Sequence, residues 1–535
     1  MKTISKERDN NCVAYPFVLS LTVIILLVAT AFIPPLNLFG LELPRRSILS
    51  QITKISENES GAGFQANIPI DSSANLPVTD TMEIVPKRSY SDTTELKTTS
   101  WTTNSYAHWQ EQPMPAKGKR PNTQREDRFT DTSEEVVIES ADSTLANFFV
   151  ALNGRETLSR PVRIAVMGDS FIEGDIFTAD LREILQKRYG GSGVGYVSFA
   201  SPIAGFRATV GHTFEGFTTY NLANSANAKS EMSKYFTVAG LFVTAQEQAQ
   251  ATFKGVSFRD NLRYYPKAKI LFINQKNSTI TVGINDTLQQ IFTPDPSANL
   301  QEININSLIE NMSVSVSNAD GFIGYGVEME SDMGVTVDNY SIRGSSGIQL
   351  TRTNAKINSQ FNRLLPYDLI ILQYGLNAMS PQVTNYTNYS NQLIRVVAFV
   401  KSCFPDASIM IMGVGDRAQN VNGEMVSMAV VEKMAQAQRR AARESGVAFW
   451  NTYEAMGGKN SMITFVKNNF ASKDYTHIRY EGGRVIARRL AQSLEDAATR
   501  WAERNIVRKD SFTTLSTPAL VLPDRLGGFK LDSLR

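Results

Sequence analysis

The sequence predicts an α/β protein in which helices cover both faces of a parallel β-sheet and a β-rich module interrupts the sheet domain. Three observations predict this class. Short apolar runs ending in glycine alternate with helical patterns early and late in the chain; a turn-rich stretch of short strands separates the two halves; and an apolar segment with a polar tract precedes both. The predicted boundaries are a cytoplasmic N-terminus with a transmembrane anchor at 1–40, a disordered linker at 41–135, the α/β domain at 136–204 and 334–503, the inserted module at 205–333, and a C-terminal tail at 504–535.

Composition excludes several functional classes. A chain of 535 residues with 42% hydrophobic content is long enough for more than one folded core. Its net charge of +2 argues against a nucleic-acid partner, and no dense run of Lys and Arg appears. Two cysteines, Cys12 and Cys403, do not form a metal-binding or disulfide pattern, and we expect Cys403 to be a small packed residue. No metal and no cofactor are therefore expected.

The N-terminal segment predicts export. Lys2, Lys6 and Arg8 precede an apolar run at 17–33, which would span roughly 25 Å as a helix, near the lower limit for crossing a membrane. Cations ahead of such a run favour a cytoplasmic N-terminus. A cleaved signal peptide is the alternative, because the residues at 29–31 resemble a cleavage site. In both cases the rest of the chain lies in the periplasm or outside the cell.

The linker at 41–135 is rich in Ser, Thr, Asn, Gln and Pro and has few sustained apolar periods. Such a stretch cannot bury enough apolar surface to offset the entropy lost on ordering. A flexible chain of this length has a root-mean-square reach of roughly 50–60 Å. His108 is expected to be a surface or linker residue.

The first strand–helix unit follows at the start of the ordered region. A helix is predicted at 141–152, a buried strand at 162–168 and a second helix at 178–191 with Gly190 as its stop. The same alternation returns later, and this favours a parallel sheet. Its predicted strands lie at 367–375, 408–413 and 447–450, and its predicted helices at 391–402, 425–444 and 482–494. The sequence after about residue 504 is expected to be irregular.

The inserted module at 205–333 lacks long helical periods. Short strands separated by Asn, Gly, Asp and Pro turns predict a β-sandwich-like fold. These strands are expected at 235–245, 251–258, 267–274, 278–285 and 322–330. His212 lies at the start of the module, where a polar turn residue is the expected role.

Ser170 is the first residue to indicate chemistry. It lies in the motif Gly168-Asp169-Ser170, directly after a buried strand and before a helix. This position is at the carboxyl edge of the sheet, where open α/β folds bind ligands, and the N–H groups of a following helix can stabilise an oxyanion. Alone the motif is weak, because an ordinary turn has the same pattern.

Asp474 and His477 supply a possible acid and base. A carboxylate three residues before an imidazole, in a turn, can accept a hydrogen bond from one ring nitrogen and leave the other as a base for a serine. The chain has only three histidines, so few others could serve. A polar turn that caps the last helix is the alternative.

Asn377 and Gly344 are candidate oxyanion donors. Asn377 ends a predicted strand on the same edge as Ser170, and its side-chain N–H can point to a substrate oxygen. Gly344, in Ser-Ile-Arg-Gly, allows a backbone N–H to approach without a side chain in the way. Each could instead belong to an ordinary turn.

Taken in order, the motifs GDS, SIRG, GLN and DYTH resemble the four sequence blocks of SGNH (GDSL) hydrolases, over residues 162 to 494. The resemblance implies a three-layer α/β/α, flavodoxin-like sheet domain and a serine esterase without metal or cofactor. It implies Ser170 as nucleophile with Asp474 and His477, and an oxyanion hole formed by Ser170, Gly344 and Asn377.

Ala378 departs from many members of this family, which have an acidic residue after the Asn. That position is not catalytic, so the departure leaves the assignment intact.

A narrower similarity links the stretches at 168–197 and 449–458, together with the interposed module, to bacterial peptidoglycan O-acetylesterases. It implies an O-acetylesterase whose partner is an acetylated glycan, with peptidoglycan as the expected substrate, tethered to the membrane through the N-terminal helix. Two alternatives stay open. An O-acetyltransferase would use the same triad with a possible membrane acyltransferase as partner, and an inactive wall-binding protein would use none of it.

Overall fold

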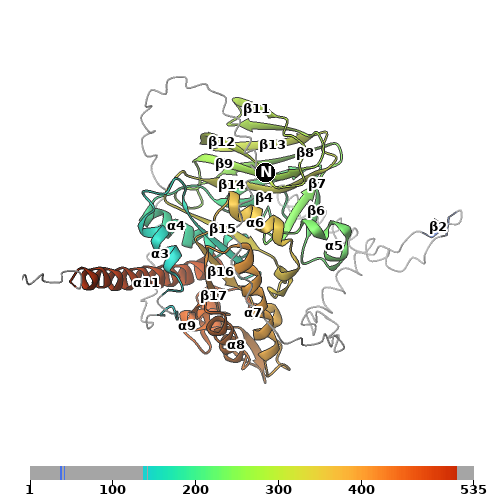
Figure 1. Ribbon diagram of the computed structural model, residues 1–535. Helices are drawn as coiled ribbons and strands as arrows, with labels where there is room; N and C mark the ends of the chain where they lie inside the picture. Colours follow the sequence, from blue (N-terminus) through green and yellow to red (C-terminus); the bar gives the residue numbers. More distant parts are fainter. Residues whose placement is uncertain (1–36, 39–40, 43–135, 141–142, 515–535) are drawn as a thin grey trace, which may run out of the picture. The chain divides into compact units, whose positions relative to one another are not determined.

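The computed structural model describes residues 37–38, 41–42, 136–140 and 143–514 (Figure 1). The chain divides into two units, Met1–Glu95 and Leu96–Arg535. In the first unit, β1 (Asn37–Leu38) and β2 (Leu41–Glu42) form an antiparallel pair. The predicted anchor at 17–33, nearly all of the linker, Cys12 and His108 lie outside the described residues. Among the residues that are described, no helix combines the length and apolar character needed to span a membrane.

A five-stranded parallel sheet forms the centre of the second unit. Its strand order is β15-β3-β16-β17-β20, and every neighbouring pair is parallel. All residues of β3, β16 and β17 are buried, as expected for strands covered on both faces. The strands are β3 (Val162–Gly168), β15 (Val335–Ser341), β16 (Leu369–Gln373), β17 (Ser408–Met412) and β20 (Ala448–Trp450).

The helices that accompany this sheet form two groups. Helix α7 packs against α6 and α8, and α11 packs against α3, α4 and α9. The arrangement is the mixed α/β architecture expected from the alternating patterns. The helices are α3 (Ala146–Asn153), α4 (Thr178–Tyr189), α6 (Ala355–Leu364), α7 (Thr387–Cys403), α8 (Val431–Ser445), α9 (Thr452–Met456), α10 (Ser461–Lys467) and α11 (Tyr480–Thr514).

Between β3 and β15 the chain builds two antiparallel sheets, seen at the top of Figure 1. One has the order β11-β10-β13-β8-β5 and the other β12-β9-β14-β7-β6, with β4 (Gly195–Ser198) pairing to β14. Apolar side chains between the sheets form a second hydrophobic core. The strands are β5 (Val210–Glu215), β6 (Thr218–Asn221), β7 (Leu241–Thr244), β8 (Gln248–Gly255), β9 (Tyr265–Asn274), β10 (Thr279–Ile284), β11 (Leu288–Phe292), β12 (Gln301–Ile309), β13 (Asn311–Ser317) and β14 (Phe322–Glu330). Short helical segments, α5 (Ser225–Lys229) and a 3₁₀ turn at Glu231–Tyr235, connect β6 to β7.

Strand β14 lies between the two cores, and all nine of its residues are buried. Val327 and Met329 point into the core between the two antiparallel sheets. Glu328 and Glu330, which alternate with them, instead bind Arg163 of the parallel sheet. A strand with one apolar and one charged face is thereby buried on both sides.

Five sequence predictions need correction. The strand predicted at 235–245 is β7, which begins only at Leu241. The helix predicted at 425–444 begins at Val431, because β18 (Ala418–Val421) and β19 (Glu424–Ser427) form a hairpin there. Its turn residues Asn422 and Gly423 have φ angles of 53° and 91°, as such two-residue turns require.

The helix predicted at 141–152 begins only at Ala146. At the other end of the chain, α11 continues to Thr514 where an irregular tail was expected after residue 504. His212 lies within strand β5 rather than in a turn, and its ring stacks on Phe253. Cys403 is buried as expected, at 1% exposure.

Candidate active site

Three parallel strands end at the same level of the sheet. Ser341 at the end of β15 and Gln373 at the end of β16 both pair with Gly168 at the end of β3. The segments that follow therefore leave the sheet at one edge, and Ile342 N–H donates to Gly168 O at 2.9 Å. A Cβ on Gly168 would lie 2.8 Å from Gln373 O, so this close approach requires glycine.

Ser170 and His477 meet at this edge, although 307 positions separate them. The distance from Ser170 Oγ to His477 Nε2 is 3.1 Å. Ser170 is 8% exposed, whereas the His477 side chain is 35% exposed. The turn that carries His477 is closed by a bridge between Ala471 and Ile478, just before α11. Two segments from opposite ends of the domain thus place a base next to a hydroxyl group.

Asp474 holds the imidazole from the other side. Its Oδ2 lies 2.7 Å from His477 Nδ1, and its Oδ1 accepts the backbone N–H groups of Thr476 and His477, both at 3.0 Å. Partial burial raises the pKa of Asp474, but the hydrogen bonds from the ring and from these two N–H groups outweigh it and lower the pKa to about 2. With Nδ1–H donating to this carboxylate, Nε2 is left to accept the Ser170 hydroxyl proton.

Two backbone N–H groups at the site, those of Ser170 and Gly344, donate to no other group in the described part of the chain. Gly344 has a φ of 76°, and a Cβ there would meet no atom within 4 Å, so its backbone faces open space. These are the features that an anion-binding donor needs.

Asn377 lies in the short 3₁₀ turn Leu376–Ala378 after β16. Its Nδ2 donates to Asp169 Oδ2 at 3.2 Å and to Ser345 O at 3.0 Å. The side chain therefore ties the segments of Ser170 and Gly344 together. A substrate oxygen would have to share these N–H groups, so the oxyanion role of Asn377 stays a prediction.

Asp169 was present in the sequence motif but was given no role. It is fully buried, and its Oδ1 accepts the Phe171 N–H at 3.0 Å. Burial raises its pKa to about 7, against the lowering effects of the Phe171 hydrogen bond and the His477 charge. In the sequence, only its position before Ser170 could have indicated that Asp169 belongs to the site, because its partner Asn377 is 208 positions away.

Within residues 136–140 and 143–514, no group of three or more His, Cys, Asp and Glu side chains is arranged to hold a metal ion.

The fold of this chain is also found among solved structures. No family model matches the chain, and no curated protein matches it. Among solved structures, a peptidoglycan O-acetylesterase is similar over 68% of this chain and 98% of its own, with a TM-score of 0.56 and 22% sequence identity. The two chains share one fold. The resemblance to peptidoglycan O-acetylesterases stated from the sequence is thereby confirmed for the fold.

Two further structures are less similar. The similarity to a family two carbohydrate esterase from Cellvibrio japonicus extends over 55% of this chain and 99% of that chain, at 10% identity and a TM-score of 0.23. An acetyl xylan esterase covers 30% of this chain and 81% of its own, at 12% identity and a TM-score of 0.23.

Proposed function

We propose that the chain is an SGNH-type serine esterase that removes O-acetyl groups from an extracytoplasmic glycan, with peptidoglycan as the expected substrate. The observation that carries the proposal is the continuous hydrogen-bonded series from Ser170 Oγ through His477 to Asp474. The fold shared with a peptidoglycan O-acetylesterase supports it. Acyl transfer by a Ser-His-Asp triad is the reaction that this geometry fits.

In the first step Ser170 Oγ attacks the acetyl carbonyl carbon while His477 Nε2 takes the hydroxyl proton. The bond from that carbon to the sugar oxygen then breaks, and His477 gives the proton to the leaving sugar oxygen. Asp474 stays ionised and stabilises the cationic imidazole between these two transfers.

The negative charge on the carbonyl oxygen is stabilised by N–H donors at the edge of the sheet. Ser170 and Gly344 offer backbone N–H groups. The side-chain N–H groups of Asn377, which also donate to Asp169 and Ser345, can donate to the same oxygen. Loss of one such donor typically lowers turnover by about 10²–10³.

In the second step His477 takes a proton from water, whose oxygen attacks the acetyl carbon. The bond from that carbon to Ser170 Oγ then breaks, His477 returns the proton to Ser170, and acetate leaves. A sugar hydroxyl in place of that water would make the chain an O-acetyltransferase, with a membrane acyltransferase as a possible acetyl source. Incubation of the purified chain with an acetyl donor and glycan oligomers separates the two reactions. Free acetate without acetylated oligomer supports the esterase, and acetylated oligomer supports the transferase.

Replacement of Ser170 by Ala tests the nucleophile. Turnover of p-nitrophenyl acetate and of acetylated peptidoglycan should fall by a factor of about 10⁴–10⁶ if the triad acts as a unit. Ser359→Ala is the matched control, since Ser359 is an exposed serine on α6. An unchanged rate in Ser170→Ala contradicts the assignment, and a wild-type chain without activity on any acetyl ester favours a wall-binding protein.

Export and membrane anchoring are part of the proposal and depend on the sequence at 17–33, outside the described residues. The full chain should fractionate with membranes and be accessible to protease from outside the cytoplasm. A variant without residues 1–40 should be recovered in the cytoplasm.

A further inference from the structure

A second hydrogen bond joins the two segments that carry Ser170 and His477. Tyr480 lies three positions after His477, at the start of α11, and its hydroxyl donates to Gly174 O at 2.6 Å. Gly174 in turn lies four positions after Ser170. Burial raises the pKa of Tyr480 above its ordinary value of 10.0, so the hydroxyl keeps its proton at neutral pH. This bond links the same segments as the contact between serine and imidazole, but neither of its partners reacts.

The segment on the serine side of this bond is held firmly. Gly174 and Asp175 both have positive φ angles, of 62° and 66°, which are uncommon for an aspartate. Asp175 is fully buried, and its Oδ1 accepts the hydroxyl of Thr178 at 2.6 Å. The first turn of α11 also approaches this segment closely, since a Cβ on Gly483 would lie only 1.9 Å from Ile176 O. Tyr480 is thus bonded to a fixed part of the domain.

The inserted module contacts Tyr480 as well. The Ala208 N–H donates to the Tyr480 hydroxyl at 3.3 Å, and the ring of Phe258 lies edge-on to the Tyr480 ring with 4.9 Å between centroids. Arg259 lies over the Phe258 ring at 4.2 Å and binds Asp180 of α4 at 3.0 Å. One side chain therefore joins the turn of the base, the segment of the nucleophile and the module.

The reaction itself removes the direct contact between the two segments. Once Ser170 is acetylated, its Oγ has no proton to donate, and His477 Nε2 has none to give while Nδ1–H donates to Asp474. The His477 side chain is 35% exposed, and the bond from Ala418 N–H to Tyr475 O holds its turn to the β18–β19 hairpin rather than to the serine segment. For the second step the imidazole must still lie within reach of a water next to the acetyl carbon. A contact outside the chemistry has to keep it there.

We propose that Tyr480 is a positioning residue that keeps His477 next to the acetylated Ser170 during the second step, and that the inserted module supports it through Ala208 and Phe258. The module would then take part in the reaction without touching the substrate. The inference rests on the acetyl-enzyme of the proposed function, and its test follows the two steps separately.

The test is hydrolysis of p-nitrophenyl acetate by the full-length Tyr480→Phe chain, which lacks only the hydroxyl. Release of p-nitrophenol in stopped flow measures acetylation of Ser170, and rapid quenching followed by intact mass measures the acetylated fraction and its decay. Loss of the acetyl group should slow by about tenfold, as expected for one positioning hydrogen bond, whereas the rate constant of acetylation should change by less than about twofold. The acetylated fraction at steady state should therefore rise.

Tyr196→Phe is the matched control. The Tyr196 hydroxyl donates to Tyr325 O at 2.7 Å, which is a bond of the same type between β4 and β14. Its loss should lower the thermal unfolding midpoint and leave both rate constants unchanged. Phe258→Leu tests the module without altering α11, and it should slow loss of the acetyl group by a smaller factor. This variant carries the test if Tyr480→Phe unfolds below the assay temperature.

Equal slowing of both steps, or unchanged rate constants in Tyr480→Phe, would overturn the positioning role. An effect of Tyr196→Phe as large as that of Tyr480→Phe would also overturn it, and unchanged kinetics in Phe258→Leu would overturn the part given to the module. Failure of the proposed function gives a different result, because the wild-type chain would then form no acetyl adduct on Ser170.

Discussion

The pair formed by Asp474 and His477 and the ion cluster around Arg163 use similar charged groups in opposite surroundings. The side chains of Asp474 and His477 are 49% and 35% exposed. Those of Arg163 and Glu328 are both 0% exposed. Water screens the first pair and is excluded from the second, so the same kind of contact has different consequences.

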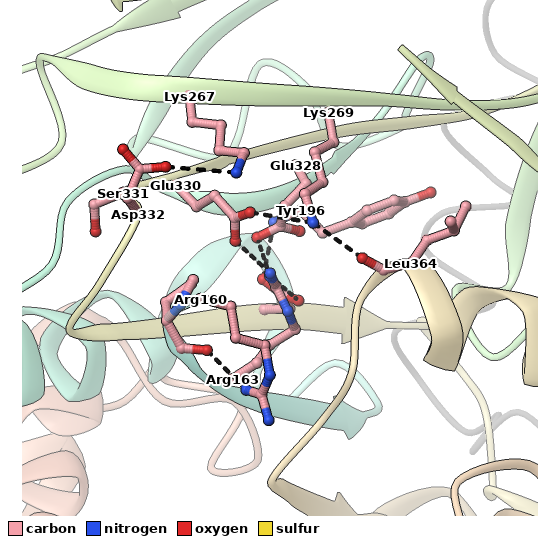
Figure 2. A network of polar contacts seen from close by, with 12 residues as sticks. Arg160, Arg163, Tyr196, Lys267, Lys269, Glu328, Glu330, Ser331, Asp332 and Leu364 are labelled. Atoms are coloured by element: carbon pink, nitrogen blue, oxygen red, sulfur yellow. Dashed lines mark hydrogen bonds and ion pairs between the residues drawn. The ribbon is translucent and has the colours of Figure 1, made fainter. Parts of the chain in front are cut away.

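The buried cluster joins the inserted module to the parallel sheet (Figure 2). Arg163 of β3 binds Glu328 of β14 at 2.7 Å, and it also binds Glu330 of the same strand. Lys269 of β9 lies 3.5 Å from Glu330, and Asp338 of β15 lies 3.8 Å from Arg163. Four strands of two different sheets therefore contribute charged side chains to one buried cluster.

The two regions differ in the protonation of their carboxyl groups. At the site, partial burial raises the pKa of Asp474, but hydrogen bonds from the His477 ring and from two backbone N–H groups outweigh it and lower the pKa to about 2, so this carboxylate is ionised. In the cluster, two cations, Arg163 and Lys269, face three carboxyl groups. Burial, followed by the charge of Asp338, raises the pKa of Glu328 well above its usual value. Glu328 therefore retains a proton, and the cluster is suited to holding the module on the sheet.

The largest effect should come from Asp474→Asn. The amide cannot stabilise the cationic imidazole and favours the wrong ring tautomer, so turnover should fall by about 10⁴. Stability should change by less than about 1 kcal/mol, because the carboxylate is half exposed. Steady-state kinetics on p-nitrophenyl acetate and urea unfolding measure the two quantities. A large loss of stability with little loss of rate would make Asp474 a structural residue.

The next largest effect should come from Arg163→Met, and it should appear in stability. Removal of the guanidinium leaves buried carboxyl groups without their main cation, at a cost of about 3–5 kcal/mol. Urea unfolding of the full chain, followed by tryptophan fluorescence, measures the change. A loss below about 1 kcal/mol would mean that the cluster contributes no more than a surface pair.

The sequence predicted four of the five strands of the parallel sheet, because their signals are local; β15 was not among the predicted strands. Strand β3 occupies the predicted range of 162–168, and its fully buried pattern follows from its apolar run. The hairpin at 418–427 was missed although Asn422 and Gly423 are a strong turn signal, because the helical pattern that follows was extended backward over it.

Contacts that join distant segments could not be predicted from the sequence. Arg163 is a single charge in an apolar strand, and its partner Glu328 is 165 positions away. The alternation in β14 indicates a polar face, and nothing local shows that another sheet covers it. At the site, the motifs pointed to Ser170 and His477, whereas the hydrogen bond between Asp169 and Asn377 joins residues 208 positions apart and has no local signal.

A third prediction concerns pH and separates the two glutamates of the cluster. Folding raises the pKa of Glu328 above its ordinary 4.5, so the folded chain retains a proton that the unfolded chain releases. This group therefore makes stability fall as pH rises above about 4.5, by at most about 1.36 kcal/mol per pH unit. Glu328→Gln mimics the protonated form and should remove this slope, as measured by urea unfolding from pH 5 to 8.

Glu330→Gln is the matched control. Burial raises the pKa of Glu330, but Arg163 and Lys269 outweigh it and lower the pKa, so this group is ionised in the folded chain. Its replacement should destabilise the chain by about 3 kcal/mol throughout this pH range, because it removes the charge that two buried cations face. Equal behaviour of the two variants would contradict the assignment of the proton to Glu328.

The smallest effect should come from Arg439→Gln, which removes an ion pair near the surface. Arg439 Nε lies 2.8 and 2.9 Å from the two carboxylate oxygens of Glu139, but the side chains are 37% and 44% exposed. The backbone bridge between Glu139 and Phe449 does not depend on the pair, so the loss should be about 0.2–1 kcal/mol. Salt at about 1 M shortens the screening length to roughly 3 Å, close to the length of this exposed pair, so the difference should become smaller there, whereas that of Arg163→Met should remain. Urea unfolding at low and high salt measures both. If Arg439→Gln cost as much as Arg163→Met, the number of hydrogen bonds rather than burial would set the contribution of a charge in this protein.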